Sequence, residues 1–119
     1  MPKTILIADT SADTRSFLKK LLADRYPLII IESPADISAI DIEKHTPSLA
    51  LIGMNESQDS NGGNVFSDIR KHDAGITVIA LGERNSENTA IEAVRLGATG
   101  YMIKPLDPHA IISLAGKHA

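Results

Sequence analysis

The sequence contains no cysteine and no tryptophan, and only two tyrosines and two phenylalanines are present among its 119 residues. The absence of cysteine excludes a disulfide framework, a thiolate metal site and a cysteine nucleophile, and it favours the cytosol. The small number of aromatic side chains leaves little on which a flavin ring could stack. A chain of this length is predicted to form one domain around a single core.

Positive charge is also sparse, because 12 lysines and arginines are outnumbered by 15 aspartates and glutamates, which gives a formal net charge of −3. No basic cluster is present, whereas a surface that binds nucleic acid non-specifically needs one. The apolar run "ILIA" stops at Asp9, so it is too short for a signal peptide or a membrane span. We therefore expect a cytoplasmic domain that contacts neither nucleic acid nor membrane and needs no cofactor.

Short apolar runs alternate with amphipathic runs along the chain, which is typical of a parallel sheet covered by helices on both faces. The predicted strands are residues 4–8, 28–32, 48–53, 76–81 and 100–103. The predicted helices are residues 12–24, Pro34 to about His45, about 64 to His72, Ser86 to Gly97, and Pro108 towards the chain end. Right-handed crossovers favour an α/β fold of the flavodoxin-like (βα)5 type, doubly wound, with strand order 2-1-3-4-5.

Capping residues and apolar stripes support these helices. Ser11 and Ser33 are predicted N-caps, Pro34 is a predicted first helical residue, and Gly97 is a predicted C′ residue. The side chains predicted to face the core are Phe17, Leu18, Leu21, Leu22, Ile37, Ile40, Val65, Phe66, Ile69, Ala90, Ile91 and Val94, with Ile42 and Ala93 as further candidates.

Ligands of such a sheet bind beyond the carboxyl ends of its strands, at the switch in strand order. The strand ends converging there are predicted to be Asp9 and Thr10, Gly53, Gly82 and Glu83, and Lys104. The crevice is therefore expected to hold one carboxylate, one lysine, one hydroxyl and two glycines. The four histidines, His45, His72, His109 and His118, are expected at or near helix ends, where no pair has the spacing of metal ligands.

Two segments, "ILIADTSADTRSFLKKLL" and "GATGYMIKPLDP", resemble the receiver domain of two-component response regulators. The resemblance extends over essentially the whole chain, and "NG" at 61–62 is similar to the Asp–Gly that opens the third helix of the family. The resemblance implies that the chain is a phosphorelay signalling domain. A receiver takes a phosphoryl group from a phosphohistidine onto an aspartate after its third strand, beside a divalent cation held by acidic residues.

This resemblance assigns roles to residues that differ from the family pattern. Asp9 matches the first metal-binding acid, whereas Thr10 stands where the second acid is expected. Gly53 stands where the phosphate-accepting aspartate is expected, and Asn55 matches the residue whose carbonyl binds the metal. Asp9 is therefore the one remaining candidate metal ligand, and no bound metal is expected.

The remaining site positions concern the switch that follows phosphorylation in the family. Gly82 replaces the hydroxyl residue that moves, and Glu83 replaces what is usually a small residue. Tyr101 matches the aromatic residue that follows this movement, and Lys104 matches the lysine that contacts the phosphoryl group. With the acceptor absent, we expect Lys104 to pair with Asp9 or with Glu83, and our hypothesis is that Glu83 enters the vacated pocket and pairs with Lys104.

The sequence thus predicts a degenerate receiver, or pseudo-receiver, that is not an enzyme and acts by protein contact without aspartyl phosphorylation. Its expected partners are a histidine kinase, an output domain or another receiver. A homodimer through the fourth helix, fifth strand and last helix is implied by the resemblance. Residues 1–119 are expected to be the N-terminal domain of a longer signalling protein.

Two alternatives stay open at this point. One is a receiver phosphorylated at a non-standard acid in the loop after the third strand, where Glu56 and Asp59 are the candidates. The other is a flavodoxin-like domain that binds a small ligand at the hydroxyl-rich loop "DTSADT", although this loop has no glycine and two carboxylates.

Overall fold

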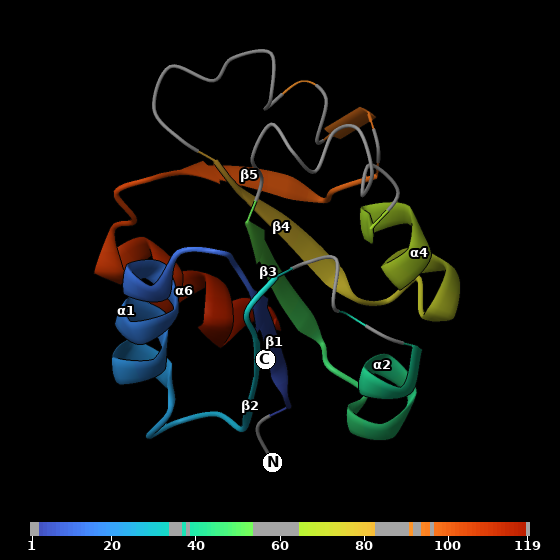
Figure 1. Cartoon of the computed structure of the whole chain (residues 1–119), viewed down its shortest axis with the longest axis horizontal. Helices are drawn as coiled ribbons and strands as arrows, with labels where there is room; N and C mark the ends of the chain where they lie inside the picture. Colours follow the sequence, from blue (N-terminus) through green and yellow to red (C-terminus); the bar gives the residue numbers. More distant parts are fainter. Residues whose placement is uncertain are drawn as a thin grey trace.

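The structure is a computed structural model that describes residues 3–33, 37, 39–53, 65–82, 91, 94–95 and 97–118. It contains a five-stranded parallel sheet with the order β2-β1-β3-β4-β5 (Figure 1). The strands are β1 (Ile5–Ala8), β2 (Leu28–Ile31), β3 (Leu49–Gly53), β4 (Thr77–Gly82) and β5 (Gly100–Ile103). The predicted fold class and strand order are therefore confirmed.

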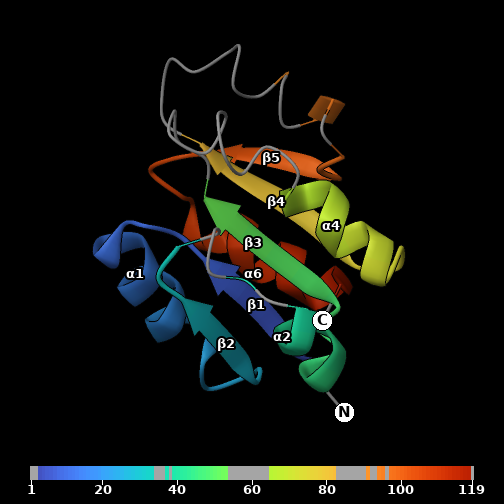
Figure 2. The same ribbon diagram turned by 45° about the vertical axis from the view of Figure 1, so that its right-hand side comes forward.

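In the described part of the chain, the two faces of this sheet are covered by α1 (Ala12–Leu22), α2 (Ala39–His45), α4 (Val65–His72) and α6 (Pro108–His118). The helices α1 and α6 lie together on one face, and α2 and α4 lie together on the other (Figures 1 and 2). None of the helices in the described part of the chain is long and apolar enough to cross a membrane.

Each face of the sheet has its own apolar core, because successive strand residues point to opposite faces. The core beneath α1 and α6 consists of Ile5, Ile7, Leu18, Leu22, Leu49, Leu51, Ile79, Leu81, Ile111 and Ala115. The core beneath α2 and α4 contains Leu6, Ala8, Ile42, Ala50, Ile52, Phe66, Ile69, Ile76, Val78, Ala80 and Ala98. Strands buried on both faces explain the continuous apolar runs of the sequence.

Local capping agrees with the sequence at Ser11 and at Gly97, and the start of α6 has a further cap. The Ser11 hydroxyl accepts a hydrogen bond from the Thr14 amide at 3.2 Å, and α1 begins at Ala12, directly after Ser11. Gly97 has a φ of 115° in the left-handed region, as predicted for a C′ residue. The Asp107 carboxylate accepts a hydrogen bond from the His109 amide at 3.0 Å, at the start of α6.

The predicted start of the second helix is wrong. Ile37 is not helical, and α2 begins at Ala39. A Ser–Pro pair suits an extended or turn segment as well as a helix start, because proline disfavours helical backbone in the residue before it.

The predicted inward orientation of Ile91 and Val94 is also wrong. Their side chains are 66% and 57% exposed, although both lie in helical segments. Helical spacing identifies residues that share a face, but it does not decide whether that face meets the sheet or the solvent. Ser86, Ala90 and Ala93, and the side chains of Ile40 and Val65, lie outside the described residues.

Candidate functional site at the carboxyl ends of the strands

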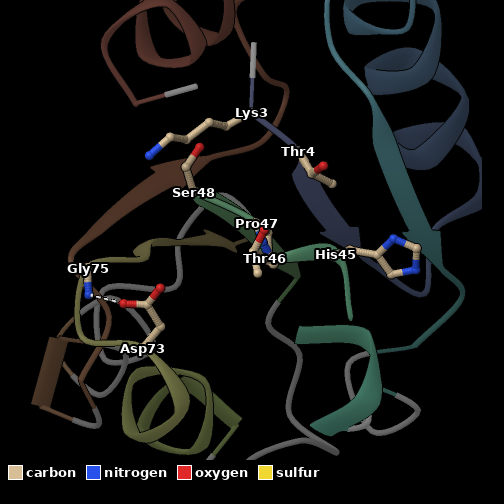
Figure 3. A pocket seen from close by; sticks show the side chains of 8 residues that line it. All are labelled: Lys3, Thr4, His45, Thr46, Pro47, Ser48, Asp73 and Gly75. Atoms are coloured by element: carbon tan, nitrogen blue, oxygen red, sulfur yellow. Dashed lines mark hydrogen bonds between the residues drawn. The ribbon is translucent and has the colours of Figure 1, made fainter. Parts of the chain in front are cut away.

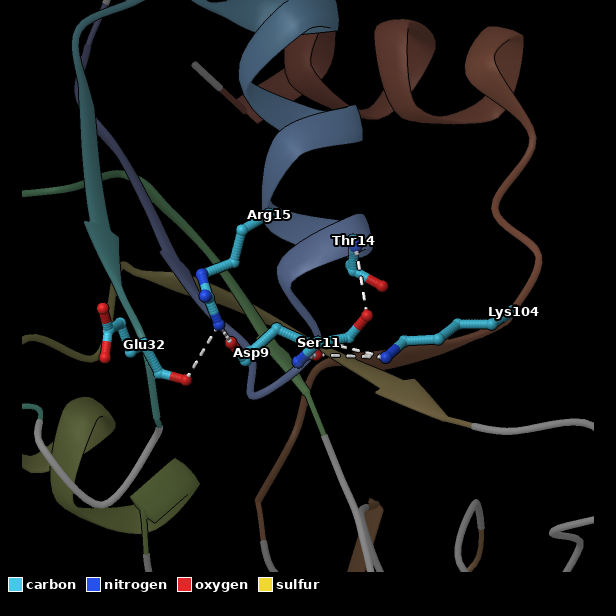
Figure 4. Close-up of polar contacts among 6 residues, drawn as sticks. All are labelled: Asp9, Ser11, Thr14, Arg15, Glu32 and Lys104. Atoms are coloured by element: carbon cyan, nitrogen blue, oxygen red, sulfur yellow. Dashed lines mark hydrogen bonds and ion pairs between the residues drawn. The ribbon is translucent and has the colours of Figure 1, made fainter.

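Asp9 directly follows β1 and is buried, with 1% of its surface exposed. One carboxylate oxygen, Oδ1, accepts hydrogen bonds from the Ser11 amide at 2.8 Å and from Lys104 Nζ at 3.1 Å. The other, Oδ2, lies 2.9 Å from the same ammonium nitrogen (Figure 4). The charge of this buried carboxylate is therefore compensated within the chain itself.

Lys104 directly follows β5, and its backbone amide donates to the Gly82 carbonyl at 2.7 Å. The peptide bond to Pro105 is cis. Since β3 and β4 lie between β1 and β5 in the sheet, the ion pair joins two strands that are not neighbours. Of the two partners expected for Lys104, Asp9 is confirmed, whereas Glu83 lies outside the described residues.

Arg15 is a site residue that sequence reasoning missed. Its guanidinium donates to the Asp9 carbonyl at 2.7 Å and to the Glu32 carbonyl at 3.3 Å, which joins α1 to the ends of β1 and β2 (Figure 4). Helical side chains lean towards the helix N-terminus. An arginine one turn after the N-cap Ser11 is therefore in a position to reach the strand ends, and this spacing is the signal in the sequence.

Gly53, the last residue of β3, lies directly against Asp9. A Cβ atom built on Gly53 would contact Oδ2 of Asp9 and lie 2.6 Å from its Cγ. Any other residue at position 53 would thus require the Asp9 carboxylate to move. The missing side chain is what lets the carboxylate lie against the end of β3 and meet Lys104.

Gly82, the last residue of β4, is covered in the same way by a neighbour on β5. A Cβ atom built on Gly82 would contact the hydroxyl oxygen and Cζ of Tyr101 and lie 2.7 Å from its Cε2. The structure therefore brings together Asp9, Gly53 and Lys104, and it brings Gly82 together with Tyr101.

Of the other predicted site residues, the structure describes Thr10 alone. Thr10 is exposed. Asn55, Glu56, Asp59 and Glu83 lie outside the described residues. Within the described part of the chain, no group of three or more histidine, aspartate or glutamate side chains could hold a metal ion.

Cavities lined by described residues lie near both ends of the sheet. A cavity of about 210 Å³ adjoins the site and is lined by Asp13, Thr14, Phe17, Lys104, Pro105 and Leu106. A second, of about 610 Å³, is lined by Lys3, Thr4, His45, Thr46, Pro47, Ser48, Asp73 and Gly75 (Figure 3). It lies at the amino ends of the strands, opposite the edge where ligands of such sheets bind.

The fold agrees with a comparison against protein families, in which the model of the response regulator receiver domain matches residues 5–115. The chain belongs to this family. As a receiver domain it is a signalling domain of two-component systems.

Individual relatives of this receiver domain are distant in sequence. It is 26% identical to the chemotaxis protein CheY of Halobacterium salinarum over 113 residues, which are 94% of this chain and 92% of that protein. It is 24% identical to the alginate biosynthesis transcriptional regulatory protein AlgB of Pseudomonas aeruginosa, over 97% of this chain and 25% of that protein. The solved BeF3-activated DrrB receiver domain has a TM-score of 0.80 at 15% identity, covering 98% and 97% of the two chains, which shows the same fold.

Proposed function

We propose that this receiver domain signals through protein–protein contact and accepts no phosphoryl group at residue 53. The observation that carries the proposal is the pair of Gly53 and Asp9 at the end of β3. Glycine has no oxygen that could attack phosphorus, and the adjacent carboxylate already pairs with the Lys104 ammonium at 2.9 Å. The nucleophile is therefore missing, and the lysine that would contact a phosphoryl group is already paired with Asp9.

The described residues also fit a magnesium ion poorly. Mg²⁺ gives up its water ligands reluctantly and prefers several anionic oxygens in octahedral geometry. The described ends of β1, β3, β4 and β5 offer the single carboxylate of Asp9, whose oxygens contact the Lys104 ammonium and the Ser11 amide. Thr10, the next residue, is neutral and exposed. We therefore assign no phosphoryl transfer through a metal to this site.

The absence of this chemistry has a consequence for signalling. A ligand can shift a two-state protein only by binding the two states with different free energies. Without a covalent phosphoryl group, the charge change that switches a receiver is not available. A partner must then recognise the unmodified surface of the domain.

An exposed apolar surface near β5 supports this mode of action. Ile103, on the edge strand β5, is 54% exposed, and Ile91 and Val94, which precede β5 in the chain, are 66% and 57% exposed. We call Ile91, Val94 and Ile103 the β5 patch. Large apolar side chains that are exposed in this way are candidates for protein contact. The partners that fit are a histidine kinase, an output domain or a second copy of this chain.

The proposal is tested by amide NMR spectra recorded with and without Mg²⁺ and beryllofluoride, a phosphoryl mimic. We expect no saturable shifts at Asp9, Gly53, Gly82 and Lys104, while the CheY of Halobacterium salinarum, measured alongside, serves as the comparison. Saturable shifts at these residues would show that the site still holds a metal–phosphoryl unit, and the proposal would be wrong.

Mass spectrometry after incubation with acetyl phosphate tests the remaining acids. A phosphoryl group on Glu56 or Asp59 would replace the proposal with phosphorylation at a non-standard position. A coloured purified protein would instead favour a small-ligand domain. We expect unmodified, colourless protein.

The β5 patch is tested with two matched variants. Ile103→Lys changes the patch, whereas Ile30→Lys changes β2 at the opposite edge of the sheet, where Ile30 is 37% exposed. Lysine is well tolerated on edge strands. Light scattering with size-exclusion chromatography should show that only Ile103→Lys alters self-association or partner binding. Equal effects of the two variants would remove the evidence for this surface.

A further inference from the structure

The ring of Tyr101 lies over the backbone of Gly82. A Cβ atom on Gly82 would contact the Tyr101 hydroxyl oxygen and Cζ, and it would lie 2.7 Å from Cε2. Such distances are shorter than any non-bonded contact between these atoms, so the ring occupies the volume that a side chain at position 82 would need. The Tyr101 hydroxyl oxygen is itself shielded from solvent.

Small residues of β4 leave the space that this ring occupies. Tyr101 is the register partner of Ala80, and Gly82 lies two residues further along the same face of β4. Ala80 carries only a methyl group and Gly82 carries nothing, so two successive positions on this face leave room for an aromatic ring. The ring packs against the core beneath α2 and α4, to which Ala80 and Val78 belong.

We propose that Gly82 holds Tyr101 in a single, inward position, so that the aromatic residue of β5 is a fixed part of the core instead of a moving switch. This inference rests on the proposed function and deepens it. A side chain at position 82 would overlap with the ring where the ring now lies. The surface around β5 therefore stays in one state, and its partners bind it without an input signal at the site.

The composition of the chain provides a direct readout, because the sequence has two tyrosines and no tryptophan. In a Tyr26→Phe background, Tyr101 is the only tyrosine, and its fluorescence reports its own exposure. We expect acrylamide to quench this fluorescence weakly. Adding Gly82→Thr, a β-branched residue suited to a strand, should expel the ring and raise the quenching constant severalfold.

Two results would overturn the inference. One is strong quenching of Tyr101 in the Tyr26→Phe protein, which would mean that the ring already lies in solvent. The other is equally weak quenching in the Tyr26→Phe/Gly82→Thr protein while its circular dichroism spectrum and melting stay native, which would mean that ring and side chain can coexist.

A suppressor keeps the test decisive if Gly82→Thr unfolds the domain. Replacing the ring in the double variant Gly82→Thr/Tyr101→Ala removes the proposed collision, so folding should return at least in part. No recovery would contradict the inference. Gly116→Ala is the matched control, because a Cβ atom there meets nothing within 4 Å and should leave Tyr101 quenching unchanged.

These measurements contain no phosphate or metal, so they are independent of the test of the proposed function. Saturable beryllofluoride shifts with a protected Tyr101 would refute the proposed function alone. A mobile Tyr101 in a protein that shows no beryllofluoride shifts would refute the inference of a fixed ring and leave the proposed function standing.

Discussion

The Lys104 ammonium and the Asp9 carboxylate lie 2.9 Å apart at positions separated by 95 residues in the chain. Their side chains are 15% and 2% exposed, so water screens the pair little. It connects the ends of β1 and β5 across the two strands between them. The pair is thus a structural contact of the whole sheet, in addition to filling the candidate site.

Removing one partner of this pair should destabilise the domain strongly, because the other charge is left buried. We expect Lys104→Met to lower the free energy of unfolding by about 3 kcal/mol, within the range for a broken buried pair. Asp9→Asn should have a smaller effect, since the amide oxygen can still accept from the Ser11 amide.

The double variant Asp9→Asn/Lys104→Met should then lose clearly less than the two single losses added together. Urea unfolding of the four proteins measures this difference. Strict additivity of the two losses would mean that the ion pair contributes nothing to stability.

Adding one methyl group should change the stability of the domain in opposite directions at Gly53 and at Gly116. At Gly53 a Cβ atom would lie 2.6 Å from Asp9 Cγ, so Gly53→Ala should cost about 1–3 kcal/mol by overpacking. Gly116 lies within α6 with no atom near the added group, and Gly116→Ala should stabilise by roughly 0.5–1 kcal/mol through helix propensity. Thermal melts of both variants check the signs, and a neutral Gly53→Ala would show that Asp9 moves freely.

The cap of α1 should contribute measurably, because it starts the helix that begins beside the site. Ser11→Ala removes the acceptor of the Thr14 amide and should cost about 1 kcal/mol. Ser16, exposed within the same helix, offers a matched control, and Ser16→Ala should be neutral or slightly stabilising. A loss of equal size in both variants, measured by urea unfolding, would contradict a specific role for the cap.

The sheet could be predicted from sequence because its central strands β1, β3 and β4 are buried on both faces and appear as continuous apolar runs. The convergence of strand ends at one edge left Asp9 and Glu83 as possible partners of Lys104, and the sequence could not decide between them; the structure shows the pair with Asp9. The close approach of Asp9 to Gly53 and of Tyr101 to Gly82 could not be predicted, because a sequence shows that glycine is small but not which neighbour takes the space. The exposure of Ile91 and Val94 was missed for a similar reason, since spacing defines a face and packing decides its environment.

Restoring one acid should not restore receiver chemistry, and this is the sharpest consequence of the proposed function. In Gly53→Asp the new side chain competes with Asp9 for the same space, and the site still lacks the second acid at Thr10. We expect this variant to be less stable and to show no magnesium-dependent beryllofluoride shifts.

Thr10→Asp/Gly53→Asp, in contrast, supplies three carboxylates at the strand ends, as magnesium prefers. A bound cation would offset the added negative charge, and Lys104 could exchange Asp9 for a phosphoryl mimic. We therefore expect saturable beryllofluoride shifts in the double variant only, with Thr10→Asp as the control for the added charge. Binding of equal strength to Gly53→Asp alone would mean that the missing acceptor is the whole defect. The Asp9–Lys104 pair would then be a consequence of that loss with no part in closing the site.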